Sequence, residues 1–201
     1  MKKSIITGIL VCFFYFINAY AYNGIYFTGE GGISTQDNLP RAAAVGANKI
    51  STNTSFNSYR GSVGYNHDLT HYFGFGLNIG YGEYGKTTYY YSDGLKDDVI
   101  SEAIECLTVS TFHITKQIDL FLKLGGIRQT VIIRGKTATE EDTNVSAEAG
   151  IGSAYNFMPR LAATLTYSRL FNHGTMQNFE GGHERPGVNE FLIGLRYTFC
   201  S

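Results

Sequence analysis

The sequence has no tryptophan, three prolines and three cysteines, and its single long apolar run lies at the amino end. A small exported protein that depends on disulfides carries more cysteines at regular spacings, so Cys106 and Cys200 are interpreted as incidental. No stretch after Ile17 has the roughly 20 apolar residues that a transmembrane helix needs. Acidic and basic residues nearly cancel, with a net charge of −1, so nothing indicates a nucleic-acid partner.

Glycine and aromatic residues are abundant instead, with 24 Gly, 15 Tyr and 14 Phe. Aromatic residues favour strands, and glycines in strands allow close approach of neighbouring groups. Because helix-forming runs are also missing, this composition predicts an all-β protein.

The amino end has the three parts of a secretory signal peptide. Met1-Lys2-Lys3 is basic, the run from Ile5 to Ile17 is apolar, and Ala19-Tyr20-Ala21 places small residues where a signal peptidase cuts. We therefore predict that residues 1–21 are a signal peptide cleaved after Ala21. Residues 22–199 are then one exported domain, as their length allows.

The last dozen residues have the clearest strand pattern. Side chains alternate across a strand, so one face here is apolar and the other carries Glu190, Gly194 and Arg196. Charges and glycines on the second face suit a strand whose apolar side is in contact with lipid. The apolar positions are Phe191, Ile193, Leu195, Tyr197 and Phe199.

The same alternation recurs along the chain and predicts eight strands. In the third of them, Phe73 to Tyr81 alternate with glycines and one asparagine. In the fourth, Glu105 and Cys106 lie on opposite parities that both contain apolar residues, so its faces stay unassigned and a bulge could switch them. The predicted strands are Tyr22–Ser34, Thr54–Asn66, Tyr72–Tyr84, Val99–His113, Ile118–Ile133, Asn144–Phe157, Arg160–Asn172 and Val188–Phe199.

The connections alternate between short and long. Short ones are Asn66–His71, Ile114–Gln117 and Met158–Pro159, and long polar ones are 35–53, 85–98, 134–143 and 173–187. Outer-membrane barrels combine short periplasmic turns with longer extracellular loops. We therefore predict an eight-stranded antiparallel up-and-down transmembrane β-barrel. A soluble lipocalin-like barrel is the alternative, and it would bury the Phe73–Tyr81 face and expose the glycines.

Three segments resemble the eight-stranded outer-membrane barrels of the OmpA transmembrane-domain, OmpX and opacity-protein type. They are the Ala19–Ala21 cleavage site, the opening strand Tyr22–Gly32 and the ending Asn189–Phe199, although the family usually stops at the aromatic residue. The resemblance implies contact with outer-membrane lipid and lipopolysaccharide and recognition by the barrel-assembly machinery. It also implies a surface protein whose loops serve adhesion, host interaction or envelope integrity. We predict no enzymatic activity, cofactor or metal.

Six charged residues fall on the inward parity of the predicted strands. An eight-stranded barrel encloses just enough room for side chains, and unpaired charges there are costly. We predict that these residues form a salt-bridged plug. Two alternatives stay open, namely hydrated charges near the rims and a narrow porin for small solutes. The six residues are Glu30, Arg60, Lys123, Glu148, Glu190 and Arg196.

One group of residues resembles the catalytic site of the outer-membrane lipid A 3-O-deacylases. His173, Thr175 and Glu190 correspond to a His-x-Ser pair and a glutamate that orients the histidine, and hydrolysis needs these groups within hydrogen-bond reach. Thr175 stands in place of the serine, and parity turns Glu190 inward and His173 toward lipid. Lipid A deacylation is therefore the alternative function.

Three consecutive tyrosines, Tyr89, Tyr90 and Tyr91, fall in the second long connection. They either continue the strand above the membrane or form a contact patch for a host or surface protein. Tyrosine suits contact surfaces because it offers area and a hydrogen bond at little entropy cost.

Overall fold

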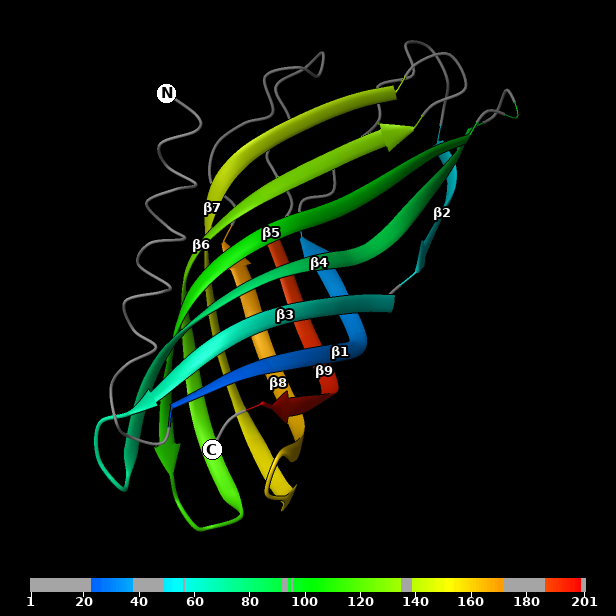
Figure 1. The fold of residues 1–201 in the computed structure, drawn as a ribbon. Coiled ribbons are helices and arrows are strands. Elements are labelled where there is room, and N and C mark those ends of the chain that lie inside the picture. Colours follow the sequence, from blue (N-terminus) through cyan, green and yellow to red (C-terminus); the bar gives the residue numbers. More distant parts are fainter. Residues whose placement is uncertain are drawn as a thin grey trace, which may run out of the picture.

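The structure is a computed structural model that describes residues 23–37, 49–55, 57–91, 94, 96–134, 139–171 and 187–199. The strands of this part of the chain close into one barrel (Figure 1). They are β1 (Asn23–Asp37), β2 (Lys49–Ser55), β3 (Asn57–Asp68), β4 (Phe73–Tyr91), β5 (Lys96–His113), β6 (Ile118–Arg134), β7 (Thr139–Met158), β8 (Leu161–Phe171) and β9 (Gly187–Thr198). Among these residues no helix is long and apolar enough to cross a membrane.

The barrel has eight strand positions because β2 and β3 share one of them. Both pair with β4, β3 opposite Gly74–Glu83 and β2 opposite Lys86–Tyr91. Every other strand pairs with its neighbours in the chain, and the β1–β9 pairing closes the cylinder. The predicted eight-stranded, antiparallel, up-and-down barrel is confirmed.

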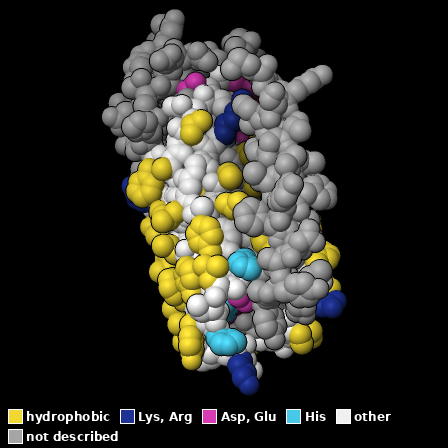
Figure 2. Space-filling view, turned by 60° about the vertical axis from the view of Figure 1, so that its left-hand side comes forward, with side chains coloured by type: hydrophobic (Ala, Val, Ile, Leu, Met, Phe, Trp, Pro, Cys, Tyr) yellow, Lys and Arg dark blue, Asp and Glu magenta, His cyan; other side chains and the backbone are white. Residues whose placement is uncertain are grey.

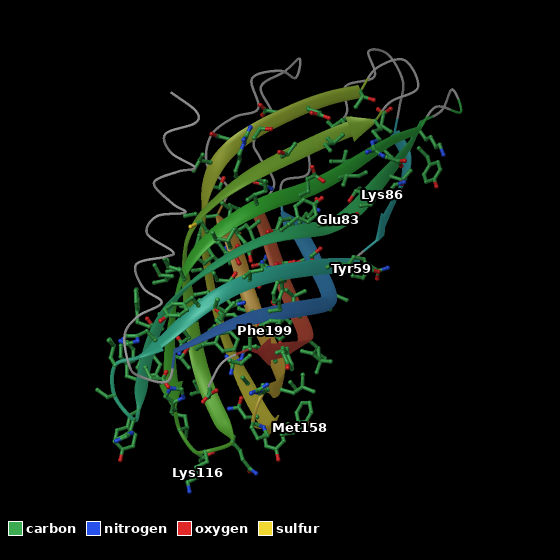
Figure 3. All side chains as sticks on the ribbon, viewed as in Figure 1. Tyr59, Glu83, Lys86, Lys116, Met158 and Phe199 are labelled. Atoms are coloured by element: carbon green, nitrogen blue, oxygen red, sulfur yellow. The ribbon has the colours of Figure 1, made fainter. Side chains whose placement is uncertain are left out.

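One end of the barrel carries the short connections. Residues 69–72, 114–117 and 159–160 join neighbouring strands there, and the first residue of β1 and the last of β9 lie at the same end. Lys116 and Met158 mark this turn end in Figure 3, whereas Glu83 and Lys86 lie toward the other, outer end. Short turns beside both termini are the arrangement expected on the periplasmic side.

At the outer end the strands run further than the sequence analysis predicts. The structure continues β4 to Tyr91 and begins β5 at Lys96 and β7 at Thr139. The upper parts of β4 to β7 therefore extend past the outer ends of β8 and β9 (Figure 1). The predicted loops 85–98 and 134–143 are thus largely strand. These segments were predicted as loops because they are polar. A strand that leaves the membrane is polar too, because it has water on its outer face.

The fourth predicted strand, β5, is regular. Its pairing with β6 runs from Asp98 to His113 without a register shift, so the bulge that was left open does not occur in this strand. Glu105 is buried and Cys106 is an exposed free cysteine, which settles the face assignment. The irregularity lies in the neighbouring strand, between Glu83 and Lys86, where Gly85 has a φ of 77° that favours glycine.

The outward faces form an apolar band around the barrel. Phe75 and Tyr81 of β4 are 43% and 48% exposed, while the glycines between them are buried, which contradicts the soluble barrel. Figure 2 shows apolar side chains gathered along one side of this surface. The band includes Phe27, Ile33, Tyr59, Phe75, Leu77, Ile79, Tyr81, Ile104, Phe112, Leu120, Leu122, Leu124, Ile151, Tyr155, Leu165, Tyr167, Phe171, Phe191, Ile193, Leu195 and Tyr197.

Inward glycines make room for the large side chains of the interior. A Cβ atom on Gly64 would overlap the ring of Tyr26, and one on Gly152 would overlap the ring of Phe121. Each ring lies over a glycine of a neighbouring strand. The high glycine content therefore follows from the narrow lumen.

Replacing Leu124 by Arg tests the apolar band. Leu124 lies on the outer face of β6, paired with Thr108 near the middle of the band. An arginine near the bilayer midplane costs about 2–4 kcal/mol, falling to about 0–1 at the interface. We therefore expect Leu124→Arg to lower the free energy of unfolding by about 2–4 kcal/mol, measured by urea unfolding from phospholipid vesicles. The control Ile104→Arg, at the outer edge beside Arg128, should cost much less. Equal losses would contradict the position of the band.

Candidate functional site

The barrel interior holds one arginine among three glutamates. Arg60 Nε lies 3.4 Å from Glu105 Oε2, Nη1 lies 2.8 Å from Glu148 Oε1, and Nη2 lies 2.5 Å from Glu190 Oε2. All four side chains are fully buried. We call these four residues the Arg60 cluster. They come from β3, β5, β7 and β9, which are every second strand of the barrel.

Among the three glutamates of the Arg60 cluster, only Glu190 accepts hydrogen bonds from hydroxyl groups. Ser58 donates a hydrogen bond to Glu190 Oε1, and Ser168 donates one to Oε2 at 3.3 Å. The carboxylate oxygens of Glu105 and Glu148 accept no well-aligned hydrogen bond from the described residues. These two glutamates are therefore held chiefly by the charge of Arg60.

The strands in between supply a second layer of polar groups. Lys123 Nζ of β6 lies 3.6 Å from Glu30 Oε2 of β1. Thr166 and Thr164 of β8 donate hydrogen bonds to Glu30 Oε1 at 2.7 and 3.3 Å. The cavity beside this pair measures only about 20 Å³, which is room for about one water molecule. A solute does not fit there.

Arg196 lies apart from the other five predicted charges, toward the turn end. Its Nη2 lies 3.0 Å from Asp119 Oδ2, which also accepts a hydrogen bond from Asn156 at 2.9 Å. His113 Nδ1 lies 2.8 Å from Asp119 Oδ1, and His113 Nε2 lies 3.2 Å from Asp68 Oδ1. This second network joins five strands across the mouth of the barrel.

An apolar layer lies between the Arg60 cluster and the outer end. Tyr84, Ala103, Ile127, Leu170 and Val188 are each at most 2% exposed and belong to one packed cluster, whose sixth member, Leu107, lies on the turn side of Glu105. The first five come from five strands, so the layer crosses the lumen. Buried polar side chains, such as Ser101 and Gln129, lie between this layer and the outer mouth.

Outside the apolar band, an ion pair joins β4 and β5. Lys86 Nζ lies 2.7 Å from Asp98 Oδ2, and Thr88 donates a hydrogen bond to Asp98 Oδ1 at 2.7 Å. Asp98 is about 20 Å along the strand from Ile104, at roughly 3.3 Å per residue. Partial burial disfavours its charge, but its contacts with Lys86 and Thr88 outweigh burial and lower the pKa of Asp98.

The three tyrosines lie on this outer part of β4, so the strand does continue through them. Tyr89 is buried, whereas Tyr90 on the opposite face is 41% exposed. The side chain of Tyr91 lies outside the described residues.

The deacylase candidates are only partly described. His173 and Thr175 lie outside the described residues. Glu190 faces inward, where it contacts Arg60, Ser58 and Ser168. No group of three or more His, Cys, Asp or Glu side chains within the described ranges is arranged to hold a metal.

The family model of the OmpA-like transmembrane domain matches residues 18–200. The chain belongs to this family. The fold and the family place this OmpA-like barrel in the bacterial outer membrane, with its turn end on the periplasmic side. No curated protein sequence matches the chain.

Solved structures share the fold of this OmpA-like barrel. The attachment invasion locus protein Ail of Yersinia pestis is 13% identical with a TM-score of 0.55, covering 88% of this chain and 97% of Ail. Neisserial surface protein A is 10% identical with a TM-score of 0.54, covering 87% of this chain and 97% of its own. A major outer membrane protein of Thermus thermophilus is 10% identical with a TM-score of 0.52, covering 89% of this chain and 100% of its own.

Among the interior groups of this barrel that sequence reasoning missed are Glu105 of the Arg60 cluster and Asp119, His113 and Asp68 of the second network. Glu105 was missed because both parities of its strand contain apolar residues. In the regular β5–β6 ladder Glu105 pairs with Ile127, and paired residues lie on the same face of the sheet. This pairing therefore assigns Glu105 to the inward face. Asp119 and His113 were missed because they lie within two residues of a turn, where a charged side chain is usually solvated.

Replacing Arg60 by Met tests the cluster. The change leaves three fully buried carboxyl groups without their shared cation, and breaking a buried ion pair costs about 3–5 kcal/mol. We expect that loss in urea unfolding of the barrel from vesicles. The control Arg128→Met removes an exposed arginine on the outer face and should change stability by less than about 0.5 kcal/mol. A similar loss of unfolding free energy in both variants would show that the buried position of Arg60 makes no special contribution to stability.

Proposed function

We propose that this barrel is a non-enzymatic surface protein, structural or adhesin-like, that acts through its extracellular part and does not conduct solutes. The observation that carries the proposal is a filled lumen combined with strands that continue beyond the apolar band. The first argues against transport, and the second supplies folded surface outside the membrane.

Three layers of side chains support the closed interior. The apolar layer at the extracellular end, the Arg60 cluster and the Lys123–Glu30 pair follow one another along the lumen. Their groups contact one another across the lumen instead of lining a water column. The six charges predicted to face inward thus act as a plug, with Glu105 added to them and Arg196 acting through Asp119 at the periplasmic mouth.

The extracellular parts of β4 to β7 form the surface available to a partner. Their outward residues include polar and aromatic side chains, with Tyr90 and Thr143 exposed and Lys86 44% exposed, beside a few aliphatic ones such as Val145. Tyrosine and a mixture of charges suit a protein contact. Ail, which shares the fold, is named for attachment and invasion. The proposed partner is a host or surface protein.

The chain ends serve export and assembly in this proposal. Residues 1–21 are removed after export, and the apolar positions at the end of the chain are recognised by the barrel-assembly machinery, namely Phe191, Ile193, Leu195, Tyr197 and Phe199. The apolar band then lies in outer-membrane lipid and lipopolysaccharide. The apolar side chains of this segment are 40–68% exposed, which leaves them accessible to an assembly factor.

Planar-bilayer recording tests the plug. The folded chain should show no large, steady conductance, because each layer fills the lumen. The double variant Glu30→Ser with Lys123→Ser removes an acid and a base together from one layer only, so it should also stay closed, because the Arg60 cluster still crosses the lumen. Large, steady conductance through the wild-type barrel would overturn the plug.

Adhesion of bacteria that display the barrel tests the surface role. Tyr90→Ser should reduce binding to cultured epithelial cells severalfold, because it removes an exposed ring outside the membrane. The control Tyr59→Ser removes a 60% exposed tyrosine from the band and should leave binding unchanged at equal surface display. Binding no higher than that of cells without the barrel would refute the role. So would loss of a lipid A acyl chain, by mass spectrometry, that depends on His173.

A further inference from the structure

We propose that the Arg60 cluster is a proton-binding site, in which the three carboxyl groups keep at least one proton in the folded barrel at neutral pH. The inference goes beyond the surface role and does not depend on whether the extracellular strands bind a partner. It concerns what the interior binds, which is a proton held between carboxyl groups.

The charge balance of the cluster requires a proton. One guanidinium faces three fully buried carboxyl groups, so complete ionisation would leave two negative charges in excess. The nearest second cation, Lys123, already pairs with Glu30. Burying an uncompensated ion costs several kcal/mol, and such a group takes up a proton instead.

The contacts indicate which carboxyl group carries the proton. Glu190 accepts hydrogen bonds from Arg60, Ser58 and Ser168, all of which stabilise a carboxylate. Glu105 has the longest contact with Arg60, 3.4 Å, and neither of its oxygens accepts a described hydrogen bond. Glu105 is therefore the principal site, with Glu148 as the group that shares the proton.

Besides Arg60, Lys123 is the one cation within the described residues that acts on Glu105, and it pairs with Glu30. Gly80 of β4 lies directly beside it, so close that a Cβ atom there would overlap Glu105 Oε1. The apolar layer closes the extracellular side. The charged and titratable groups that act on Glu105 are Arg60 of β3, Tyr84 of β4, Lys123 of β6, Glu148 of β7, Glu190 of β9 and Tyr26 of β1, while β8 supplies the hydroxyl of Ser168.

Proton retention has a defined effect on stability. A glutamate in the unfolded chain loses its proton at about pH 4.3. Above that pH, folding takes up one proton for each carboxyl group that stays protonated inside the barrel. The equilibrium constant for unfolding then rises about tenfold per pH unit and per retained proton, until the buried group also ionises.

Infrared spectroscopy of the wild-type barrel in vesicles is the direct test. At neutral pH we expect a C=O band of a protonated carboxyl group, which shifts on exchange into heavy water. Glu105→Gln keeps the shape of the side chain and should remove or weaken that band. It should also flatten the rise of the unfolding constant with pH. Glu148→Gln is the second variant, for use if Glu105→Gln does not fold.

Glu83→Gln is the matched control, because Glu83 lies exposed on the outer face of β4. It should leave both the band and the pH dependence unchanged. Absence of the protonated-carboxyl band from the wild-type spectrum at neutral pH would overturn the proposal. An undiminished band in both Glu105→Gln and Glu148→Gln would do the same. Neither result bears on adhesion, so a failure here is distinguishable from a failure of the surface role.

Discussion

Closure of the backbone hydrogen-bond ladder is the constraint on which this structure depends. In hydrocarbon an unpaired N–H or C=O group has no water to bind, so a sheet that crosses a membrane must have no free edge. The pairing of β1 with β9 removes that edge here. Once the ladder is closed, side chains alternate between lipid and lumen, and the residues of each strand are divided into two unlike sets. The narrow lumen, its glycines and its buried charges all follow from this closure.

The lumen is organised by alternate strands. Side chains from β3, β5, β7 and β9 form the Arg60 cluster, whereas Glu30 and Lys123 come from β1 and β6, which are among the strands in between. In a tilted barrel, inward residues of every second strand lie at one height, so polar layers stack along the axis. The Arg60 cluster and the Lys123–Glu30 pair each join strands that share no backbone hydrogen bonds with one another. The interior charges therefore stabilise the cross-section of the barrel, which the ladder alone does not fix.

The predictable part of this molecule is the part that depends on parity alone. The alternation that recurs along the chain, clearest from Phe73 to Tyr81, was enough to assign the strand number, membrane contact and the faces of every strand but the fourth, because each depends only on neighbouring residues. Which charges meet depends on strand register, and a single sequence does not contain it. Arg60 and Arg196 have the same parity, yet one lies in the cluster and the other at the periplasmic mouth. Extracellular strand ends were missed because neither of their faces is in contact with lipid.

The two halves of the molecule respond differently to sequence change. Within the membrane, every inward position is coupled to others across the lumen, so replacing Arg60 affects carboxyl groups on three further strands at once. Beyond Glu83 the strands hold together by backbone pairing and exposed contacts such as Lys86–Asp98, and exposed pairs contribute little to stability. Outward residues there can therefore be replaced without affecting the plug. A surface protein gains from this separation, because its contact surface can change while the membrane part stays folded.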